Sequence, residues 1–264
     1  MNLYINPSGG IAGDMFAAAL ISAGANEKTM LNGLLIAANK IGHSSFSTVL
    51  TDDGSTRLNI VIDHFQAHLS AHAARHYLKE IFAELNMESA YREFGFKALQ
   101  ILIEAEEKAH KECGFLTDHL QKRQHDCKYH QHFHTPPKDQ RDDTYLHEAQ
   151  DILIDITGAA LGLQLLGITP RAILLNAVSL GGGTINFSHG HLSVPAPAVK
   201  NIMIKYKIPV VMGPVDSELC TPTGAAILAA LGANSLGVAP VTAQMKGRSR
   251  GGKDLPIPPL EILC

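Results

Sequence analysis

The chain has 264 residues, a formal net charge of −3 and 45% hydrophobic residues. Its length gives one large domain or two small ones with an ample core, and its near-neutral charge argues against nucleic acid or an anionic membrane as a partner. Four widely spaced cysteines without a Cys-x-x-Cys pair, and an N-terminus without a secretory signal pattern, lead us to expect a cytoplasmic protein without a disulfide framework.

The first 112 residues are predicted to alternate between strands and helices. Residues 3–5 form a short apolar strand, which the segment SGGIAGD (8–14) ends. Four helices are expected at 15–23, 27–41, 70–85 and 90–112, because strong helix formers or apolar residues at helical spacing occupy them. Between the second and third helix, runs at 46–50 and 58–62 flank Asp52-Asp53-Gly54-Ser55 and predict a β-hairpin.

The second half begins with a polar, histidine-rich segment at 114–144, which we expect to be a long loop or a disordered, flexible insert. A buried helix at 147–166, a β run at 173–179, an extended segment at 192–197, a helix at 200–205, a strand at 209–212 and a helix at 223–231 follow. The end is basic and glycine-rich at 246–253 and extended at 256–259. The pattern predicts an α/β fold, with α+β as the alternative: a mixed sheet with flanking helices in one globular unit.

Histidine is the most unusual feature of the composition, because eleven of the fourteen histidines lie between residues 64 and 147. His68, His72 and His76 recur every four residues, a spacing that puts all three on one face of a helix. Imidazole is a common ligand for nickel, zinc and copper, so this row predicts a metal site, with a solvated histidine face as the alternative. The second cluster, at 125–134, predicts a mobile metal-collecting loop or an inert tract.

Carboxylates follow the last of these histidines. Glu148, Asp151 and Asp155 are spaced by three and four residues, which puts them on one side of an otherwise apolar predicted helix. Buried carboxylates are costly unless they are paired or bind a cation. We therefore expect His147 and Glu148 to be metal ligands, and Asp151 and Asp155 to act as a base or to orient ligands.

Glycine-rich loops or helix-start segments recur at three places in the chain. The segment 8–14 predicts either a tight structural turn or a site contributing Asp14, which is a further candidate base. Gly181, Gly182 and Gly183, with His189 nearby, form a second glycine loop after a strand. Thr221 and Thr223 lie at the start of the last predicted helix, and one or the other would cap it. Together these segments suggest a phosphorylated ligand.

Taken in order, these segments resemble the LarC-type nickel-insertion proteins, which mature the nickel-pincer cofactor of lactate racemase. The family pattern SGxxGDM is matched by residues 8–15, its histidine-rich helix start by 68–76, and its AEAxxHG helix end by 105–110. The elements HE…D…DxxGA, HGxLPVPAPA and GELxTPTGAA are matched at 147–159, 189–198 and 217–226, and 247–263 approximates the closing motif. The chain departs from the pattern in a spacing that is two residues shorter after His147-Glu148 and in the long insert.

The resemblance implies a CTP-dependent insertion of nickel into a pyridinium-3,5-bisthiocarboxylic acid mononucleotide. Longer members continue into a second part that binds CTP, so we expect residues 1–264 to be the metal-handling N-terminal portion, and a separate CTP-binding polypeptide is a candidate partner. The metal, base and phosphate roles given above are inferences from the residues and are not fixed by the resemblance.

Two other functions remain open from the sequence. A nickel chaperone or storage protein would use the histidine-rich segments and would need no mononucleotide. A metal-dependent phosphohydrolase would use the carboxylates and glycine loops, and turnover of a phosphoester with a divalent metal would reveal it.

Overall fold

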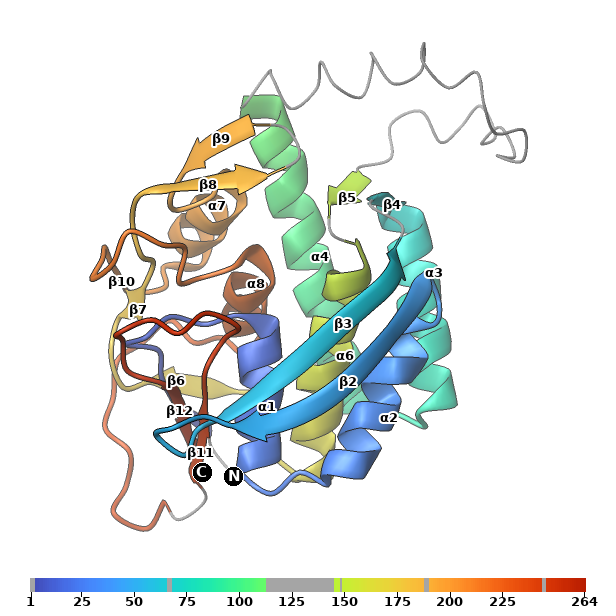
Figure 1. Ribbon diagram of the computed structural model, residues 1–264, viewed down its shortest axis with the longest axis horizontal. Coiled ribbons are helices and arrows are strands. Elements are labelled where there is room, and N and C mark those ends of the chain that lie inside the picture. The colour runs from blue at the N-terminus through green and yellow to red at the C-terminus, as the bar shows by residue number, and fades with distance from the viewer. Residues whose placement is uncertain (1–2, 66–67, 113–144, 148, 188–189, 244–245) are drawn as a thin grey trace.

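A six-stranded mixed sheet forms one side of the molecule in the computed structural model, which describes residues 3–65, 68–112, 145–147, 149–187, 190–243 and 246–264 (Figure 1). The strand order is β2 (Gly42–Leu50), β3 (Thr56–Phe65), β11 (Lys246–Ser249), β12 (Leu260–Leu263), β1 (Leu3–Asn6) and β6 (Ala172–Leu174). The pairs β1–β6 and β3–β11 are parallel, and the other neighbours are antiparallel. A mixed sheet with flanking helices was the predicted fold.

Helices pack behind this sheet in successive layers. They are α1 (Gly13–Ser22), α2 (Glu27–Ala38), α3 (Ala71–Glu84), α4 (Ser89–Glu112), α6 (Ala149–Leu165), α7 (Pro197–Tyr206) and α8 (Pro222–Ala230). Helix α1 contacts β3, β11 and β12, while α6 contacts α1, α2 and α4. On its other side α4 contacts α7 and α8 (Figure 1). None of the helices among the described residues is long and apolar enough to span a bilayer.

Helix α6 lies at the centre of this arrangement, and its residues 152–163 are all buried. Two glycines let α1 approach it closely. A Cβ atom on Gly158 would lie 2.9 Å from the Ala17 Cβ atom, and one on Gly162 would lie 2.7 Å from Leu20 Cδ1. The sequence prediction of a buried helix is therefore confirmed, but its predicted start at His147 is wrong, because that residue belongs to a strand.

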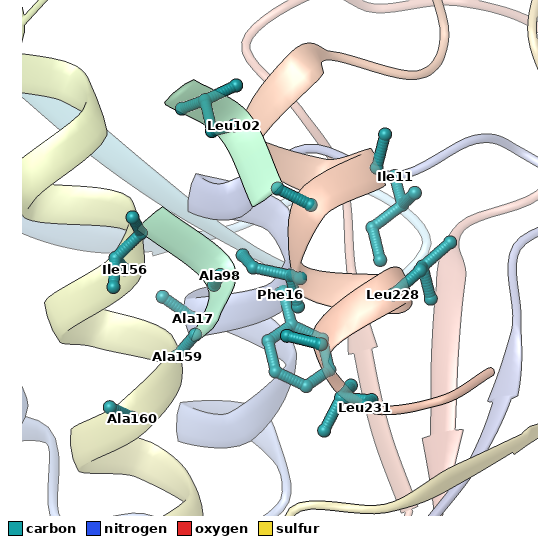
Figure 2. Packing of buried hydrophobic residues seen from close by; sticks show 14 of the residues in the cluster. Ile11, Phe16, Ala17, Ala98, Leu102, Ile156, Ala159, Ala160, Leu228 and Leu231 are labelled. Carbon is teal, nitrogen blue, oxygen red and sulfur yellow. The ribbon is translucent and has the colours of Figure 1, made fainter. Parts of the chain in front are cut away.

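The hydrophobic core joins α1, α4, α6 and α8 (Figure 2). Phe16 is fully buried and lies beside Leu228 and Leu231 of the α8 segment, while Ala98 and Leu102 approach from α4 (Figure 2). Small side chains at the helix crossings allow this density, because alanine lets two helix axes come close without a loss of contact.

In the part of the chain that the structure describes, three short ladders lie outside the main sheet. They pair β4 (His68–Ser70) with β5 (Tyr145–His147), β7 (Val178–Ser179) with β10 (Val210–Val211), and β8 (Thr184–Phe187) with β9 (Gly190–Ser193). The predicted β run at 173–179 is thus divided between β6 and β7, which pair with different partners. The predicted extended segment at 192–197 is divided between the end of β9 and the start of α7.

The end of the chain differs most from the sequence prediction. The sequence predicts a basic, glycine-rich tail at 246–253, yet residues 246–249 form β11. Both β11 and the following strand, β12, are interior strands of the sheet. The sequence of β11, KGRS, carries no apolar alternation. Its Gly247 is required by packing, because a Cβ atom there would lie 2.0 Å from the Ala19 carbonyl oxygen. The insert at 114–144 lies outside the described residues.

Candidate functional site

The starts of α1 and α8 lie against each other, although more than 200 residues separate them in the sequence. Ile11 donates its amide to the Leu219 carbonyl at 2.8 Å, and Thr221 donates to the Ile11 carbonyl at 3.1 Å. Glycines permit this contact: a Cβ atom on Gly10, whose φ is +88°, would lie 2.0 Å from the Leu219 oxygen, and one on Gly224 would lie 2.3 Å from the Ile11 oxygen. Two positive helix ends are therefore brought together.

Asp155 of α6 lies at this junction and is only 2% exposed. Thr223, in the first turn of α8, donates its hydroxyl to Asp155 Oδ2 at 2.7 Å. On the other side, a Cβ atom on Gly13 would lie 2.2 Å from the Asp155 carboxyl carbon. A carboxylate at the starts of two helices is stabilised by their dipoles, so this predicted catalytic residue lies where it links α1, α6 and α8.

A chain of hydroxyl groups leads from Asp155 to the surface. Thr221 caps α8 by accepting the Gly224 amide at 3.2 Å, and the hydroxyl oxygens of Thr221 and Thr223 are 3.1 Å apart. With an ionised Asp155 the Thr223 proton is directed to the carboxylate, so Thr223 accepts the Thr221 proton. Of the two predicted caps, Thr221 is the one that caps α8, and the acceptance of the Thr223 proton by Asp155 sets the order of donors along the chain.

Thr221 also lines a pocket of about 230 Å³ in front of the two helix starts. Asp14, Glu218 and Lys253 line the same pocket. Ala12 at the start of α1 has no side chain that can cap the helix, and Asp14 Oδ1 accepts a hydrogen bond from the Met15 amide at 2.7 Å. Burial raises the pKa of Asp14 above its ordinary value, with hydrogen bonds from the backbone opposing the change. The pocket thus contains a carboxyl group that is more basic than usual.

The two cations beside the pocket have different roles. Arg250 is engaged with the protein, because its Nη2 lies 2.7 Å from Asp53 Oδ2 and its Nη1 donates to the Ile257 carbonyl at 2.8 Å. This guanidinium lowers the pKa of Asp53 and ties the hairpin turn to the segment after β11. Lys253 is exposed and reaches the Ser217 hydroxyl at 3.3 Å. Lys253 is therefore the cation that a ligand in the pocket can recruit.

The glycine loop at 181–183 is shaped by residues 213–217, which pack against it. Gly181 donates to the Gly213 carbonyl and Gly182 to the Ser217 carbonyl, each at 3.2 Å. A Cβ atom on Gly181 would lie 1.8 Å from the Ser217 oxygen. Close packing against residues 213–217 explains the glycine at position 181. The amides of Gly181 and Gly182 both have carbonyl partners within the chain. Phosphate binding by the loop stays a prediction, and His189 lies outside the described residues.

The predicted row of three histidines on one helix face is wrong for His68. This residue belongs to β4, and α3 begins only at Ala71, after Ser70 accepts the Ala73 amide as the N-cap. His72 and His76 do lie on α3; both are exposed, and His76 Nε2 is 3.3 Å from Glu80 Oε1. Instead, His68 is the register partner of His147 across the β4–β5 ladder.

Metal ligation by the remaining predicted residues stays a prediction. The side chains that the structure describes form no group of three or more histidine, cysteine, aspartate or glutamate residues able to hold a metal ion. Glu148 and the cluster at 125–134 lie outside the described residues. Of the predicted carboxylate row, Asp151 and Asp155 are both on α6, and Asp155 is the one that reaches the helix junction.

Glu218 and Lys253 are charged pocket residues that were not among the predicted site residues. Glu218 lies three residues before the Thr221 cap, a position at which its charge approaches the start of α8. Lys253 lies in the basic, glycine-rich segment 246–253. The position of Glu218 just before a predicted helix cap is a sequence signal for a site residue. The position of Lys253 at the pocket depends on the pairing of β11 and β12, the strands on either side of it in the chain.

The comparisons with a family model and with curated proteins agree with each other. The family model described as nickel insertion protein matches residues 3–114 and 138–262. A Synechococcus elongatus protein named "Putative nickel insertion protein" is 30% identical over 260 residues, which cover 97% of this chain and 57% of that protein. A protein of the same name from Geobacter sulfurreducens is 32% identical over 256 residues, again covering 57% of its length. The chain therefore spans a little over half the length of these curated relatives. No solved structure matches it.

Proposed function

Because the chain belongs to the nickel insertion protein family, we propose that it takes part in inserting Ni²⁺ into pyridinium-3,5-bisthiocarboxylic acid mononucleotide, the acceptor that the sequence resemblance implies. The family match over residues 3–114 and 138–262, which together make up most of the chain, is the observation that carries the proposal. Since the chain spans little more than half of its relatives, we assign it the metal-handling part of the process, with a separate CTP-binding polypeptide as partner.

The reaction requires a base. Nickel replaces a hydrogen on a ring carbon of the acceptor, so a carbon–hydrogen bond breaks, a carbon–nickel bond forms and one proton leaves. Asp14 is the best candidate to accept this proton, because it lines the pocket and burial raises its pKa. Asp155 is less suited, since it is buried and accepts the Thr223 hydroxyl. Asp151 is not among the pocket residues.

The acceptor is an anion, and the pocket offers features that suit one. The adjoining starts of α1 and α8 carry positive partial charge, and the exposed ammonium of Lys253 lines the same space. Of the two predicted phosphate sites, the turn at 221–224 is better supported than the loop at 181–183, because Thr221 lines the pocket and the three glycines of the loop do not. No step is routed through CTP, because the resemblance assigns CTP to the second part of longer members.

The test is a nickel transfer assay. The purified chain is mixed with Ni²⁺ and the mononucleotide, with and without CTP and a CTP-binding polypeptide of the family, and the nickel-bearing product is measured by mass spectrometry. We expect product in the complete mixture and its loss with Asp14→Asn. The exposed Asp52, outside the pocket, provides the matched control Asp52→Asn, which should keep full activity.

The same mixture separates insertion from storage. A chain that binds Ni²⁺ but neither binds the mononucleotide nor yields product in any combination would overturn the proposal in favour of a nickel store. Hydrolysis of a phosphoester in the presence of Ni²⁺ without any nickel-bearing product would favour the phosphohydrolase instead.

A further inference from the structure

We infer that the pocket holds the sugar phosphate end of the acceptor in one orientation, with a ribose hydroxyl group donating a hydrogen bond to Thr221 and the phosphate group beside Lys253. This inference rests on the proposed function, because it takes the mononucleotide as the ligand and names the residues that recognise its sugar. Thr221 is then a specificity-determining residue, and Thr223 and Asp155, which act through it, are positioning residues.

The hydroxyl protons of the two threonines are ordered toward Asp155. Thr223 donates its hydroxyl proton to Asp155 Oδ2 at 2.7 Å. The Thr223 oxygen lies 3.1 Å from that of Thr221, and because a hydroxyl group has only one proton, Thr221 is the donor in this contact. Asp155 is only 2% exposed, so water does not compete for the Thr223 proton.

What Thr221 offers to a ligand follows from this order. A hydroxyl group has one proton and two lone pairs. The Thr221 proton goes to Thr223, and one lone pair accepts the Gly224 amide at 3.2 Å. The second lone pair remains for a ligand in the pocket that Thr221 lines. Thr221 therefore accepts a hydrogen bond from a ligand and does not donate one.

The backbone amides beside Thr221 donate within the chain. Ile11 donates to the Leu219 carbonyl at 2.8 Å, and the Thr221 amide donates to the Ile11 carbonyl at 3.1 Å. The Gly224 amide is used by the cap, and Pro222, the first residue of α8, has no amide proton. A phosphate group presents acceptor oxygens. The Thr221 side of the pocket therefore suits a hydroxyl donor better than a phosphate group.

Carboxylates line the same pocket and favour the same kind of ligand group. Asp14 and Glu218 are both lining residues, and an ionised carboxylate accepts hydrogen bonds but repels a phosphate anion. An acidic side chain that accepts a ribose hydroxyl is also the device that dinucleotide-binding folds use to hold the sugar. Because Asp14 is the candidate base, Glu218 is the second acceptor that we assign to the sugar.

The cation of the pocket sets the direction of the ligand. Lys253 is exposed, and its Nζ lies 3.3 Å from the Ser217 hydroxyl. Arg250 also lines the pocket, but its guanidinium is bound to Asp53. An ammonium group forms charge-assisted hydrogen bonds with phosphate oxygens. The phosphate group is therefore assigned to Lys253, and the sugar to the side of the pocket that Thr221 lines.

The experiment measures the binding of ribose-bearing probes to the full chain by calorimetry. The probes are nicotinic acid mononucleotide, which shares the pyridinium ring, ribose and phosphate of the acceptor, and its 2′-deoxy and 3′-deoxy analogues. We expect one of the two deoxy analogues to bind about two- to tenfold more weakly, which is the effect of one neutral hydrogen bond. Equal affinities for all three probes, or no binding of any of them, would overturn the inference.

Variants at Thr221 assign this preference to its hydroxyl group. Thr221→Val should remove the preference, whereas Thr221→Ser, which keeps the hydroxyl group and the cap, should retain it. The exposed Thr169 lies outside the pocket, and Thr169→Val is the matched control that should bind the probes like the wild type. A preference that survives in Thr221→Val, or that is lost equally in Thr221→Ser, contradicts the role of Thr221.

An analogue in which fluorine replaces the preferred hydroxyl group tests the direction of the bond, because fluorine cannot donate a proton. The wild type should bind it about as weakly as the deoxy analogue, and equal binding of the fluoro and hydroxyl probes would show that Thr221 donates. Thr223→Val releases the Thr221 proton and should narrow the gap between these probes, while Thr223→Ser should preserve it. Circular dichroism checks that each variant is folded at the assay temperature. An unchanged gap in Thr223→Val contradicts the positioning role of Thr223 and Asp155.

The phosphate assignment is tested with nicotinic acid riboside, which lacks the phosphate group. Lys253→Gln should weaken binding of the mononucleotide about tenfold, which is the effect of a charge-assisted hydrogen bond, and should leave binding of the riboside unchanged. Lys28 is an exposed residue of α2 outside the pocket, and Lys28→Gln should change neither affinity. Equal effects of Lys253→Gln on both probes contradict a phosphate group at Lys253.

The nickel transfer assay is scored separately from binding. The expected sugar preference without nickel-bearing product in any mixture counts against the proposed function alone. Product formation by a wild-type chain that binds all the sugar analogues equally counts against the sugar site alone.

Discussion

At the scale of single residues, Gly13 and Asp14 show how neighbours in one short motif serve different purposes. Gly13 is buried against the Asp155 carboxyl group, where a side chain has no room. Asp14, the next residue, lines the pocket and has a raised pKa. The sequence left a choice between a structural turn and a functional carboxylate, and the structure assigns the first role to the glycine and a place in the pocket to the aspartate.

Gly13→Ala should destabilise the protein. The added methyl group would meet the carboxyl carbon of Asp155 at 2.2 Å, and overpacking of this kind costs about 1–3 kcal/mol. The measurement is the free energy of unfolding in urea. Gly252→Ala is the control, because a Cβ atom there meets nothing within 4 Å. Equal stability of the two variants would contradict the close contact between α1 and α6.

Asp14→Asn should leave stability at neutral pH unchanged or raise it, although it removes the candidate base. Burial raises the pKa of Asp14, so the folded chain binds this proton more tightly than the unfolded chain. Stability from this group is therefore greatest below the unfolded pKa of about 3.9 and is lost as the pH rises through the folded pKa. Asparagine cannot ionise and retains an oxygen for the Met15 amide.

The thermal midpoints of the wild type and Asp14→Asn, measured at pH 3 and pH 7, check this sign. They should agree at pH 3, and the variant should equal or exceed the wild type at pH 7. A variant that is less stable only at pH 7 would show that the ionised carboxylate contributes stability, and Asp14 would then be a cap with an ordinary or lowered pKa.

At the scale of elements, the start of α8 is the feature that organises the site. Pro222 occupies the first turn, where its missing amide costs nothing, and Thr221 and Thr223 link the helix to Asp155 of α6. This link holds three helix segments at fixed positions behind the pocket. A sequence pattern of cap, proline, threonine and glycine predicts the helix start but contains no information on which carboxylate it meets.

Thr223→Val should destabilise this junction by about 1–3 kcal/mol, because a buried carboxylate loses a hydroxyl donor and valine has nearly the same shape. Thr223→Ser, which keeps the hydroxyl group, should recover most of the loss. Both values come from urea unfolding monitored by circular dichroism. If Thr223→Val left the free energy of unfolding unchanged, the hydrogen bond between Thr223 and Asp155 would not be what holds α8 to α6.

The start of α3 explains why the predicted row of three histidines on one helix face is wrong for His68. A spacing of four residues fits a helix, but Ser70 caps α3 and leaves His68 in the preceding strand. A serine two residues after the first histidine was a signal for a helix boundary. No local signal, however, indicates that His68 pairs with His147, because strand pairing across a long connection depends on the whole fold.

At the scale of the whole molecule, the sheet is completed by strands from the two ends of the described chain. Strand β12 lies between β1 and β11, with Tyr4 opposite Leu263 and Gly247 opposite Ile262. The chain segments on which the pocket depends, 8–14 and 250–258, follow β1 and precede β12. The pocket therefore exists only when the first and last strands have paired.

Deletion of residues 260–264 should abolish the folded state. It removes an interior strand, exposes the edges of β1 and β11, and takes the fully buried Leu260 and Ile262 out of the core. The expected result is loss of the cooperative unfolding transition in calorimetry. Leu260→Ala and Ile262→Ala, each expected to cost about 2–5 kcal/mol, provide graded comparisons. A deletion variant that unfolds like the wild type would contradict the central place of β12.

The sequence by itself determined the helices, the hairpin, the buried character of α6, the capping of α8 and the family, because each depends on local periodicity, on turn and cap residues, or on an ordered series of motifs. Tertiary structure decided the rest: β11 and β12 as interior strands, the meeting of the α1 and α8 starts at Asp155, and the register of His68 with His147. These features join residues far apart in the chain. They are set by close backbone packing and strand pairing, which residue spacing along the sequence does not encode.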